Sequence, residues 1–221
     1  PALPRQPLPP KPTRDEFSAA TLDLEWNHVR NPDTARYSLS ERPGWLRLKG
    51  ASVSLDDLAS PTAVVRRQRH FGVQLATRLD FSPTRDGDEA GLVLRQTDAL
   101  HAEFFVTRTN GERRLVLRLS EPVKPTEPCK KTVLSDISAP AGAIQLLVTA
   151  DRDQYRFTWK SDDGKTGDAG SIPTSALAVE ASWPKGIMCF TGMMAGLYAT
   201  GNGAEASAPA DFDWFDYLPQ E

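Results

Sequence analysis

Neighbouring acidic side chains are the first feature of this sequence that could do chemistry. They occur at Asp56-Asp57, at Asp86, Asp88 and Glu89, and at Asp162-Asp163. Two carboxylates can serve as general acid and base on either side of a scissile glycosidic bond. All but the first pair lie in turn contexts, where aspartate commonly accepts hydrogen bonds from nearby backbone. We therefore interpret these acidic groups as structural.

Histidine and cysteine offer no better catalytic or metal site. His28, His70 and His101 do not fall at ligand spacing, and no Cys/His cluster predicts zinc. The sequence also lacks a nucleophile elbow, a P-loop and a dinucleotide fingerprint. Cys129 and Cys189 are too few for a disulfide framework, and although they could pair, we expect buried thiols. This chain alone is predicted not to be an enzyme.

Aromatic rings could bind sugars, because they stack on the apolar faces of pyranose and furanose rings. The chain has five tryptophans, most of which a β-rich fold would use in its core. Trp45 and Trp183 are adjacent to Gly44 and Pro184 in predicted loops, so they are the candidates for exposed sugar-stacking residues.

Length and charge narrow the class of protein. A chain of 221 residues can bury a substantial core as one domain. Its formal net charge of −3 argues against a general nucleic-acid binder, which needs a basic surface. No apolar run approaches the ~20 residues of a membrane span, and the first residues lack the apolar core of a secretory signal.

Short alternating runs separated by turn residues predict an all-β chain. Asn110-Gly111 joins two such runs and is a strong hairpin signal, because a type I′ turn needs positive φ at both central residues. One helical turn is predicted near Thr174–Val179. Regular turns without intervening helices favour a two-sheet antiparallel β-sandwich of the jelly-roll kind. The other predicted strands are 44–49, 62–70, 73–81, 91–97, 143–150 and 154–161.

The stretch 190–219 predicts two further strands that are apolar on both faces. Residues 193–198 place no polar side chain on either face, so this strand should be covered on both sides. In the last strand Phe212 and Trp214 alternate with Phe215 and Tyr217. We expect another domain to cover the second set of aromatics, although a β-bulge at Trp214-Phe215 would also explain the change of phase.

Residues 1–14 are predicted to be a linker, and residues 15–221 a single β-sandwich accessory domain. Six prolines fall within residues 1–13, and proline favours an extended conformation without ladder hydrogen bonds. A ligand for a proline-recognising domain is the alternative for this segment.

Seven short motifs occur in the order found in a known family. Together they resemble the C-terminal, concanavalin A-like β-sandwich of family 43 glycoside hydrolases, which are β-xylosidases and α-L-arabinofuranosidases, and they are similar to carbohydrate-binding module family 91. The resemblance begins near Phe17 and covers nearly the whole chain. The motifs are Arg30–Asp33, Tyr37–Leu39, Glu41–Leu48, Arg66–Phe71, Ala90–Leu94, Phe190–Gly192 and Ala210–Asp213.

The resemblance implies where the chemistry lies. In that family a five-bladed β-propeller preceding the sandwich performs catalysis, and a sandwich loop helps to close its pocket. The corresponding residues here are Met188, Cys189, Phe190 and Thr191, with Cys189 where the family commonly has a phenylalanine. The role of such a loop would be water exclusion and shape.

The resemblance also suggests a ligand, a cation and an assembly. No cofactor is expected to be required, but a structural calcium would use Asp15 or Glu16 with Asp213, which otherwise are ordinary surface carboxylates. The expected function is a non-catalytic module that binds xylan or xylo-oligosaccharides and packs on the propeller. A purely structural role is the alternative. A homo-oligomer is a further expectation, and a secreted or periplasmic location is favoured over the cytoplasm.

Overall fold

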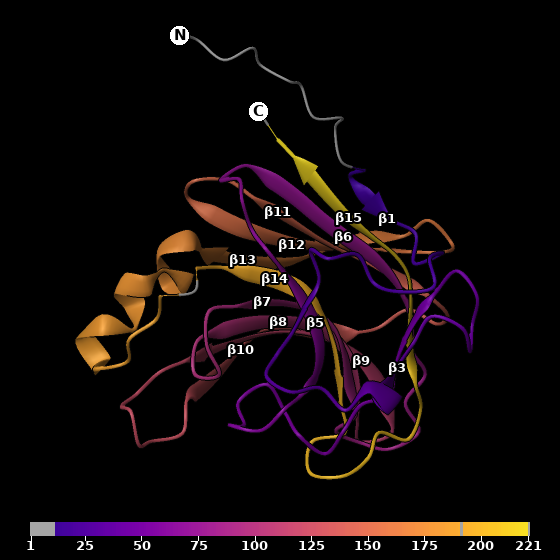
Figure 1. Cartoon of the computed structure of the whole chain (residues 1–221), viewed down its shortest axis with the longest axis horizontal. Coiled ribbons are helices and arrows are strands. Elements are labelled where there is room, and N and C mark those ends of the chain that lie inside the picture. The colour runs from indigo at the N-terminus through magenta and orange to yellow at the C-terminus, as the bar shows by residue number, and fades with distance from the viewer. Residues whose placement is uncertain (1–11, 191, 221) are drawn as a thin grey trace, which may run out of the picture.

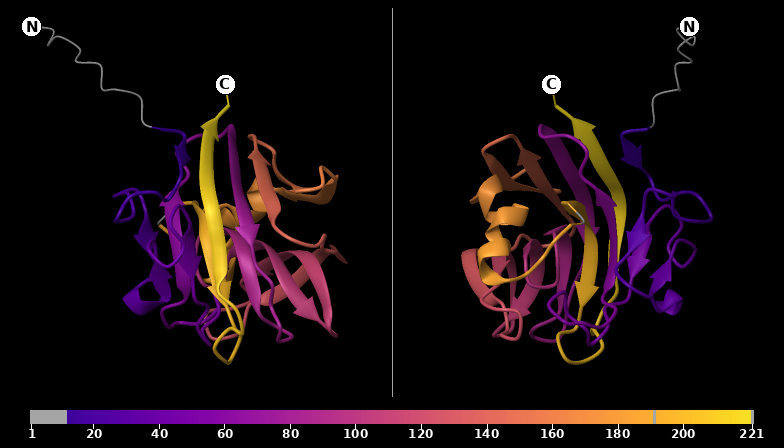
Figure 2. Two further views of the ribbon diagram at one scale, coloured as in Figure 1. Left: turned by 90° about the vertical axis from the view of Figure 1, so that its right-hand side faces the viewer. Right: turned by 60° about the vertical axis from the view of Figure 1, so that its left-hand side comes forward.

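Two antiparallel sheets packed face to face make up the protein (Figure 1). The computed structural model describes residues 12–190 and 192–220. Figure 2 shows the two layers from the side, with the long last strand running the length of one of them. The predicted all-β sandwich is therefore confirmed.

The first sheet contains the last strand of the chain near its middle. Its strand order is β13-β12-β11-β6-β15-β4-β3, and β1 pairs with β15 beside this path. The strands are β1 (Arg14–Asp15), β3 (Tyr37–Ser38), β4 (Leu46–Leu48), β6 (Val73–Asp80), β11 (Ile144–Ala150), β12 (Gln154–Ser161), β13 (Thr166–Pro173) and β15 (Ala210–Pro219).

The second sheet has the order β10-β9-β8-β7-β14-β5-β2. Its strands are β2 (Asn27–His28), β5 (Thr62–Arg67), β7 (Glu89–Arg95), β8 (His101–Thr109), β9 (Glu112–Glu121), β10 (Lys130–Ser138) and β14 (Met194–Thr200). Short 3-10 helices complete the described chain: η1 (Thr34–Arg36), η2 (Thr174–Leu177), η3 (Val179–Ala181) and η4 (Trp183–Lys185). The helical turn predicted near Thr174 is η2, and two more turns follow it.

The predicted Asn-Gly hairpin is present between β8 and β9. Asn110 has φ of 52° and Gly111 has φ of 81°, the left-handed backbone that a type I′ turn requires. The turn fixes the register, so Thr109 pairs with Glu112 and Glu103 pairs with Arg118. This register decides which side chains of the two strands share a face.

The main core lies between the sheets and follows the two-residue period of the strands. Leu75 of β6, Phe104 of β8, Ile144 of β11 and Phe157 of β12 are all buried there. The rings of Phe104 and Phe157 meet edge to face across the two sheets, with centroids 5.7 Å apart. Each such side chain contributes about 1.5–3 kcal/mol through burial, so the alternating strands alone explain how the sheets associate.

The aromatic side chains of β15 are buried by a bulge and not by another domain. The register against β6 shifts between Phe212 and Phe215, which inserts an extra residue. As a result Phe212, Phe215 and Tyr217 all face the main core. Trp214 points elsewhere and is covered by the Arg14 guanidinium, 4.1 Å from its ring centroid. The expectation that a second domain covers these aromatics is therefore wrong, and the bulge is confirmed.

Strand β14 is covered on both faces, as its sequence predicts. Ala195 and Leu197 belong to the main core. Tyr198 lies on the opposite face, in a smaller cluster with Phe105 and Val65. Leu55, from the connection between β4 and β5, helps to cover this second cluster. Both faces of β14 are thus buried within the chain.

The beginning of the sandwich is fixed by its first strand. Arg14 pairs with Asp216, and Asp15 pairs with Phe215, so β1 adds to the sheet beside β15. Most of the predicted proline-rich linker, residues 1–11, lies outside the described residues. Within the described part of the chain, no helix is both long and apolar enough to span a membrane.

Candidate functional site

Two large apolar side chains project from the loop between η4 and β14. Met188 is 71% exposed and Phe190 is 74% exposed, whereas Cys189 between them is 2% exposed. Exposure therefore alternates from one side chain of this loop to the next. Thr191, the fourth residue predicted for this site, lies outside the described residues. Of the predicted loop residues, Met188 and Phe190 therefore lie at the surface.

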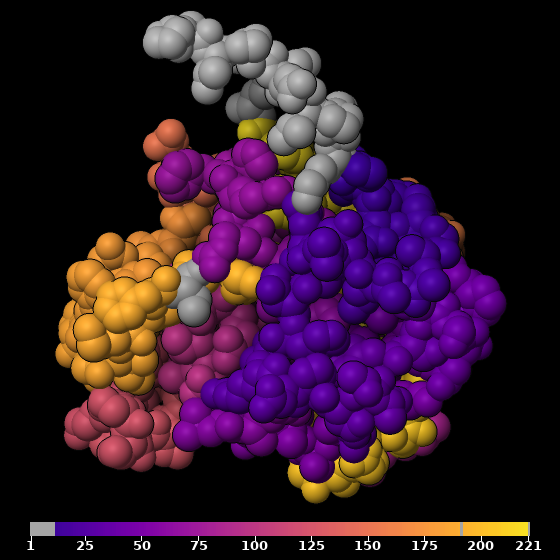
Figure 3. Space-filling view, viewed as in Figure 1, coloured from indigo at the N-terminus to yellow at the C-terminus, as the bar shows by residue number. Residues whose placement is uncertain are grey.

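The segment that carries this loop projects from the body of the sandwich. Figure 3 shows residues 174–190 beside the connection between β9 and β10. A cavity of about 890 Å³ separates the two, lined by Pro125, Glu127, Ile187 and Met188 among others. The exposed Met188 and Phe190 therefore belong to a protruding part of the surface.

A second groove on the described surface holds another exposed aromatic ring. Phe71 is 69% exposed and lines a groove of about 470 Å³ with Met193 and Tyr155. The Arg152 guanidinium lies 4.9 Å from the Phe71 ring centroid. Tyr155 donates its hydroxyl hydrogen to Gln68 Oε1 at 3.0 Å. Met193, which lines this groove, follows Phe190 closely in the sequence.

The two tryptophans predicted to stack on sugars differ in exposure. The guanidinium groups of Arg42 and Arg78 lie 3.6 Å and 5.5 Å from the Trp45 ring centroid. Trp45 is half-buried under them, so little of its ring is available to a sugar. Trp183 in η4 is 52% exposed and is the better candidate of the two.

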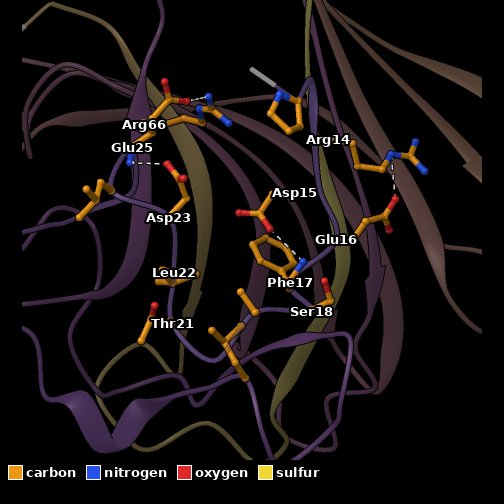
Figure 4. A pocket seen from close by; sticks show the side chains of 14 residues that line it. Arg14, Asp15, Glu16, Phe17, Ser18, Thr21, Leu22, Asp23, Glu25 and Arg66 are labelled. Atoms are coloured by element: carbon orange, nitrogen blue, oxygen red, sulfur yellow. Dashed lines mark hydrogen bonds and ion pairs between the residues drawn. The ribbon is translucent and has the colours of Figure 1, made fainter. Parts of the chain in front are cut away.

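The carboxylates predicted for calcium are held by other groups. Asp15 accepts hydrogen bonds from the Phe17 backbone nitrogen at 2.9 Å and from Trp26 Nε1 at 2.8 Å. Asp213 pairs with Arg78 at 3.0 Å. Exposed Glu16 lies 3.9 Å from Arg14, as Figure 4 shows. Among the described residues, no three acidic, histidine or cysteine side chains form a group that could hold a metal. A structural calcium here stays a prediction.

A buried ionic network on the second sheet was not predicted from the sequence. The Arg118 guanidinium contacts Glu103 at 2.6 Å and Glu89 at 2.7 Å. These carboxylates are 2% and 6% exposed. Burial opposes the charge on Arg118, but Glu103 and Glu89 hold its pKa above the usual value. Burial raises the pKa of Glu89 despite the ion pair. The guanidinium also lies 4.5 Å from the Phe105 ring centroid, which places the network on the face turned away from the main core.

Asp56 extends the buried network toward the molecular surface. It accepts a hydrogen bond from Cys129 Sγ at 3.0 Å, pairs with Lys131, and lies 3.4 Å from His101 Nε2. Burial alone would raise the pKa of Asp56, but hydrogen bonds from His101, Lys131 and Cys129 hold it well below its usual range. Burial and the adjacent carboxylate raise the pKa of Cys129 to about 11. These contacts tie Asp56 to β8 and β10.

Acid should weaken the fold through Asp56. Its pKa is lower in the folded state, so its contribution is present above the unfolded pKa of about 3.9 and is lost as pH falls below it. We expect Asp56→Asn to lower the free energy of unfolding by about 2 kcal/mol at pH 7. The difference in unfolding free energy between Asp56→Asn and the unchanged chain should become smaller toward pH 3, as measured by urea titration. A deficit that is the same at both pH values would contradict this role.

The two cysteines are thiols and do not form a disulfide with each other. Cys129 is half-buried beside Asp56, and Cys189 is buried with its sulfur 3.1 Å from Gln96 Oε1. The expectation of buried thiols is therefore met fully by Cys189 and partly by Cys129.

Comparisons with known proteins agree with this structure. Residues 14–218 match the family model described as the β-xylosidase C-terminal concanavalin A-like domain. The chain is 35% identical over 217 residues to the non-reducing end α-L-arabinofuranosidase BoGH43B of Bacteroides ovatus. That match covers 98% of this chain and 39% of the relative.

Solved structures extend the comparison to the fold. The Bacteroides ovatus xyloglucan-locus GH43B structure superimposes with a TM-score of 0.89 and 33% identity, covering 99% of this chain and 41% of that one. The xylan β-1,4-xylosidase of Bacillus halodurans gives a TM-score of 0.87 at 28% identity, with the same coverage.

The match is confined to one part of each relative. The chain spans about two fifths of the length of the enzymes it matches. The described residues form the sandwich alone and include no counterpart of a catalytic propeller. On its sequence and its fold, this chain belongs to the family of C-terminal concanavalin A-like domains of family 43 β-xylosidases and arabinofuranosidases.

Proposed function

We propose that this domain packs on the catalytic β-propeller of a family 43 glycoside hydrolase and shapes its active site with the loop that carries Met188 and Phe190. The observation that carries the proposal is the exposure of these two side chains beside a buried Cys189. A complex in which a partner covered both side chains would be stabilised, because their apolar area would be removed from water. The relatives support a catalytic partner, because they are xylosidases and arabinofuranosidases of more than twice this length.

The groove at Phe71 supports the same docking surface. Phe71 adds a second exposed ring, and Met193, which lines the same groove, follows Phe190 closely in the sequence. Arg69 and Arg152 also line this groove, and guanidinium groups suit an interface because they are weakly hydrated and bind carboxylates in pairs. The occupant that fits is an apolar surface with acidic side chains at its rim.

The loop would contribute shape and water exclusion to the reaction. Cys189 is buried with its sulfur 3.1 Å from Gln96 Oε1, whereas the Phe190 ring beside it in the chain is 74% exposed and can meet a partner's pocket. An apolar ring closing a pocket excludes water and strengthens the electrostatic interactions of the catalytic groups inside. The acid and base themselves would come from the propeller. The test is the effect of Phe190→Ala on hydrolysis of aryl β-D-xylosides and aryl α-L-arabinofuranosides.

A second function, binding of xylan by this domain alone, is favoured by the exposure of Trp183. We expect xylohexaose to bind this chain saturably in calorimetry, and Trp183→Ala to weaken binding about tenfold or more through loss of stacking. Trp45→Ala is the matched control and should leave binding unchanged, because Arg42 and Arg78 already cover that ring. Absence of binding at millimolar xylohexaose would leave only the docking role.

A further inference from the structure

The segment that carries Met188 and Phe190 is attached to the sandwich by few side chains. From Thr174 to Phe190, only Leu177, Ser182 and Cys189 are buried. The rest consists of the 3-10 turns η2, η3 and η4, and neither η3 nor η4 contains a buried hydrophobic residue within its bounds. Turns of this kind gain little from their own hydrogen bonds, so tertiary contacts must hold the segment in place.

One side chain of the sheet contacts both ends of this segment. Gln96 directly follows β7 and is 5% exposed. Its Nε2 donates to the Leu177 carbonyl oxygen at 3.0 Å, and its Oε1 lies 3.1 Å from Cys189 Sγ. The orientation of the amide follows from the chemistry. A carbonyl oxygen can only accept, so Nε2 must face Leu177, and Oε1 is left to accept from the thiol.

Gln96 is itself fixed by the turn that joins β7 to β8. Its backbone nitrogen donates to the Leu100 carbonyl oxygen at 3.0 Å. In the same turn, Thr97 Oγ1 accepts from the Leu100 nitrogen at 3.0 Å. The amide is therefore presented from a hydrogen-bonded turn at the end of the sheet to a segment with little regular structure. A group held in this way can determine the position of the segment it contacts.

We propose that Gln96 is a positioning residue that sets the direction in which Phe190 projects. The contact with Gln96 holds the Cys189 thiol inward, and the next side chain, Phe190, lies on the outer side, so fixing the thiol fixes the side on which Phe190 projects. Holding the Leu177 carbonyl keeps the start of the segment against the sheet. The structural part of this inference concerns this chain alone, and its consequence for hydrolysis rests on the proposed docking function.

Hydrogen exchange on this chain tests the structural part. Gln96→Met keeps the length of the side chain but removes both hydrogen bonds, and it should speed exchange about tenfold or more in peptides covering Ser182–Ile187. Exchange in β8 and β9 should be unchanged. Cys189→Ala should also speed exchange in these peptides. Cys189→Ser keeps a hydrogen-bond donor, so its exchange rates should stay close to those of the unchanged chain. Unchanged exchange in Gln96→Met, or equal acceleration in β8 and β9, would overturn the proposal.

A double substitution separates positioning from general weakening of the enzyme. In a protein that carries this chain behind a family 43 catalytic domain, Gln96→Met should lower kcat/KM by acting through Phe190. The combination of Gln96→Met and Phe190→Ala should then be no worse than Phe190→Ala alone. If the double variant instead lost kcat/KM by the product of the two single losses, the positioning role of Gln96 would be overturned. The exchange result does not depend on hydrolysis, so it stands even where Phe190→Ala alone shows no kinetic effect and the docking function fails.

Discussion

Replacing Arg118 with methionine is expected to lower the free energy of unfolding by about 3 to 5 kcal/mol. The guanidinium contacts two carboxylates that are almost fully buried, Glu89 and Glu103. Methionine fills much of the same space but leaves both carboxylates without their cation. The loss therefore comes mainly from uncompensated buried charge, and guanidinium chloride titration at pH 7 would measure it.

Arg114 provides a control on the same strand. It pairs with Asp136 at 2.8 Å near the surface, where the Asp136 side chain is 45% exposed. An exposed ion pair of this kind contributes at most about 1 kcal/mol, so Arg114→Met should have a small effect. The Arg118→Met deficit should also narrow at lower pH, because protonation removes the unpaired charges. Equal, small losses in the two variants would show that the buried network does not stabilise the fold.

The strands that the sequence predicted are those with a buried face and a clear period. β6, β8, β9, β11 and β12 all match predicted runs. The strands that were missed are edge strands: β10 is largely exposed, and β13 contains two glycines. An edge strand needs neither an apolar stripe nor high β-propensity when its neighbour supplies the pairing. Hydrophobic periodicity alone therefore could not identify them.

In the last strand, β15, the alternation of aromatic side chains wrongly suggested that another domain covers one face. Phe212 and Phe215 are an odd number of positions apart, and a regular strand would place them on opposite faces. The bulge between them returns both to the same core. Nothing local to the sequence distinguishes a bulge from a strand buried on both sides, and pairing with β6 decides it.

The buried network could have been found from the hairpin prediction. Asn110-Gly111 fixes the register of β8 against β9, and that register places Glu103 directly opposite Arg118. The hairpin does not predict that Glu89 belongs to the network, because the position of Glu89 depends on the pairing of β7 with β8. The exposure of Phe190 likewise follows from the fold around Cys189, although the resemblance to a known family pointed to the loop.

Phe190→Ala is expected to lower kcat/KM about 10- to 100-fold in a protein that carries this chain behind a family 43 catalytic domain. The estimate corresponds to losing about 1.5–3 kcal/mol, the contribution of one phenylalanine side chain that becomes buried on docking against the pocket. Stability of this chain should not change, because the ring is 74% exposed in it. Phe190→Leu, which keeps most of the apolar bulk, should recover part of the loss.

The most direct test of the account is therefore the steady-state hydrolysis of an aryl β-D-xyloside and an aryl α-L-arabinofuranoside by this two-domain protein and its Phe190→Ala variant. Leu134→Ala is a control, since Leu134 is an exposed apolar residue on the edge strand β10 and is 44% exposed. We expect a large loss of kcat/KM for Phe190→Ala with no change in thermal unfolding, and no loss for Leu134→Ala. Kinetics of Phe190→Ala that equal those of the unchanged protein on both substrates would contradict it.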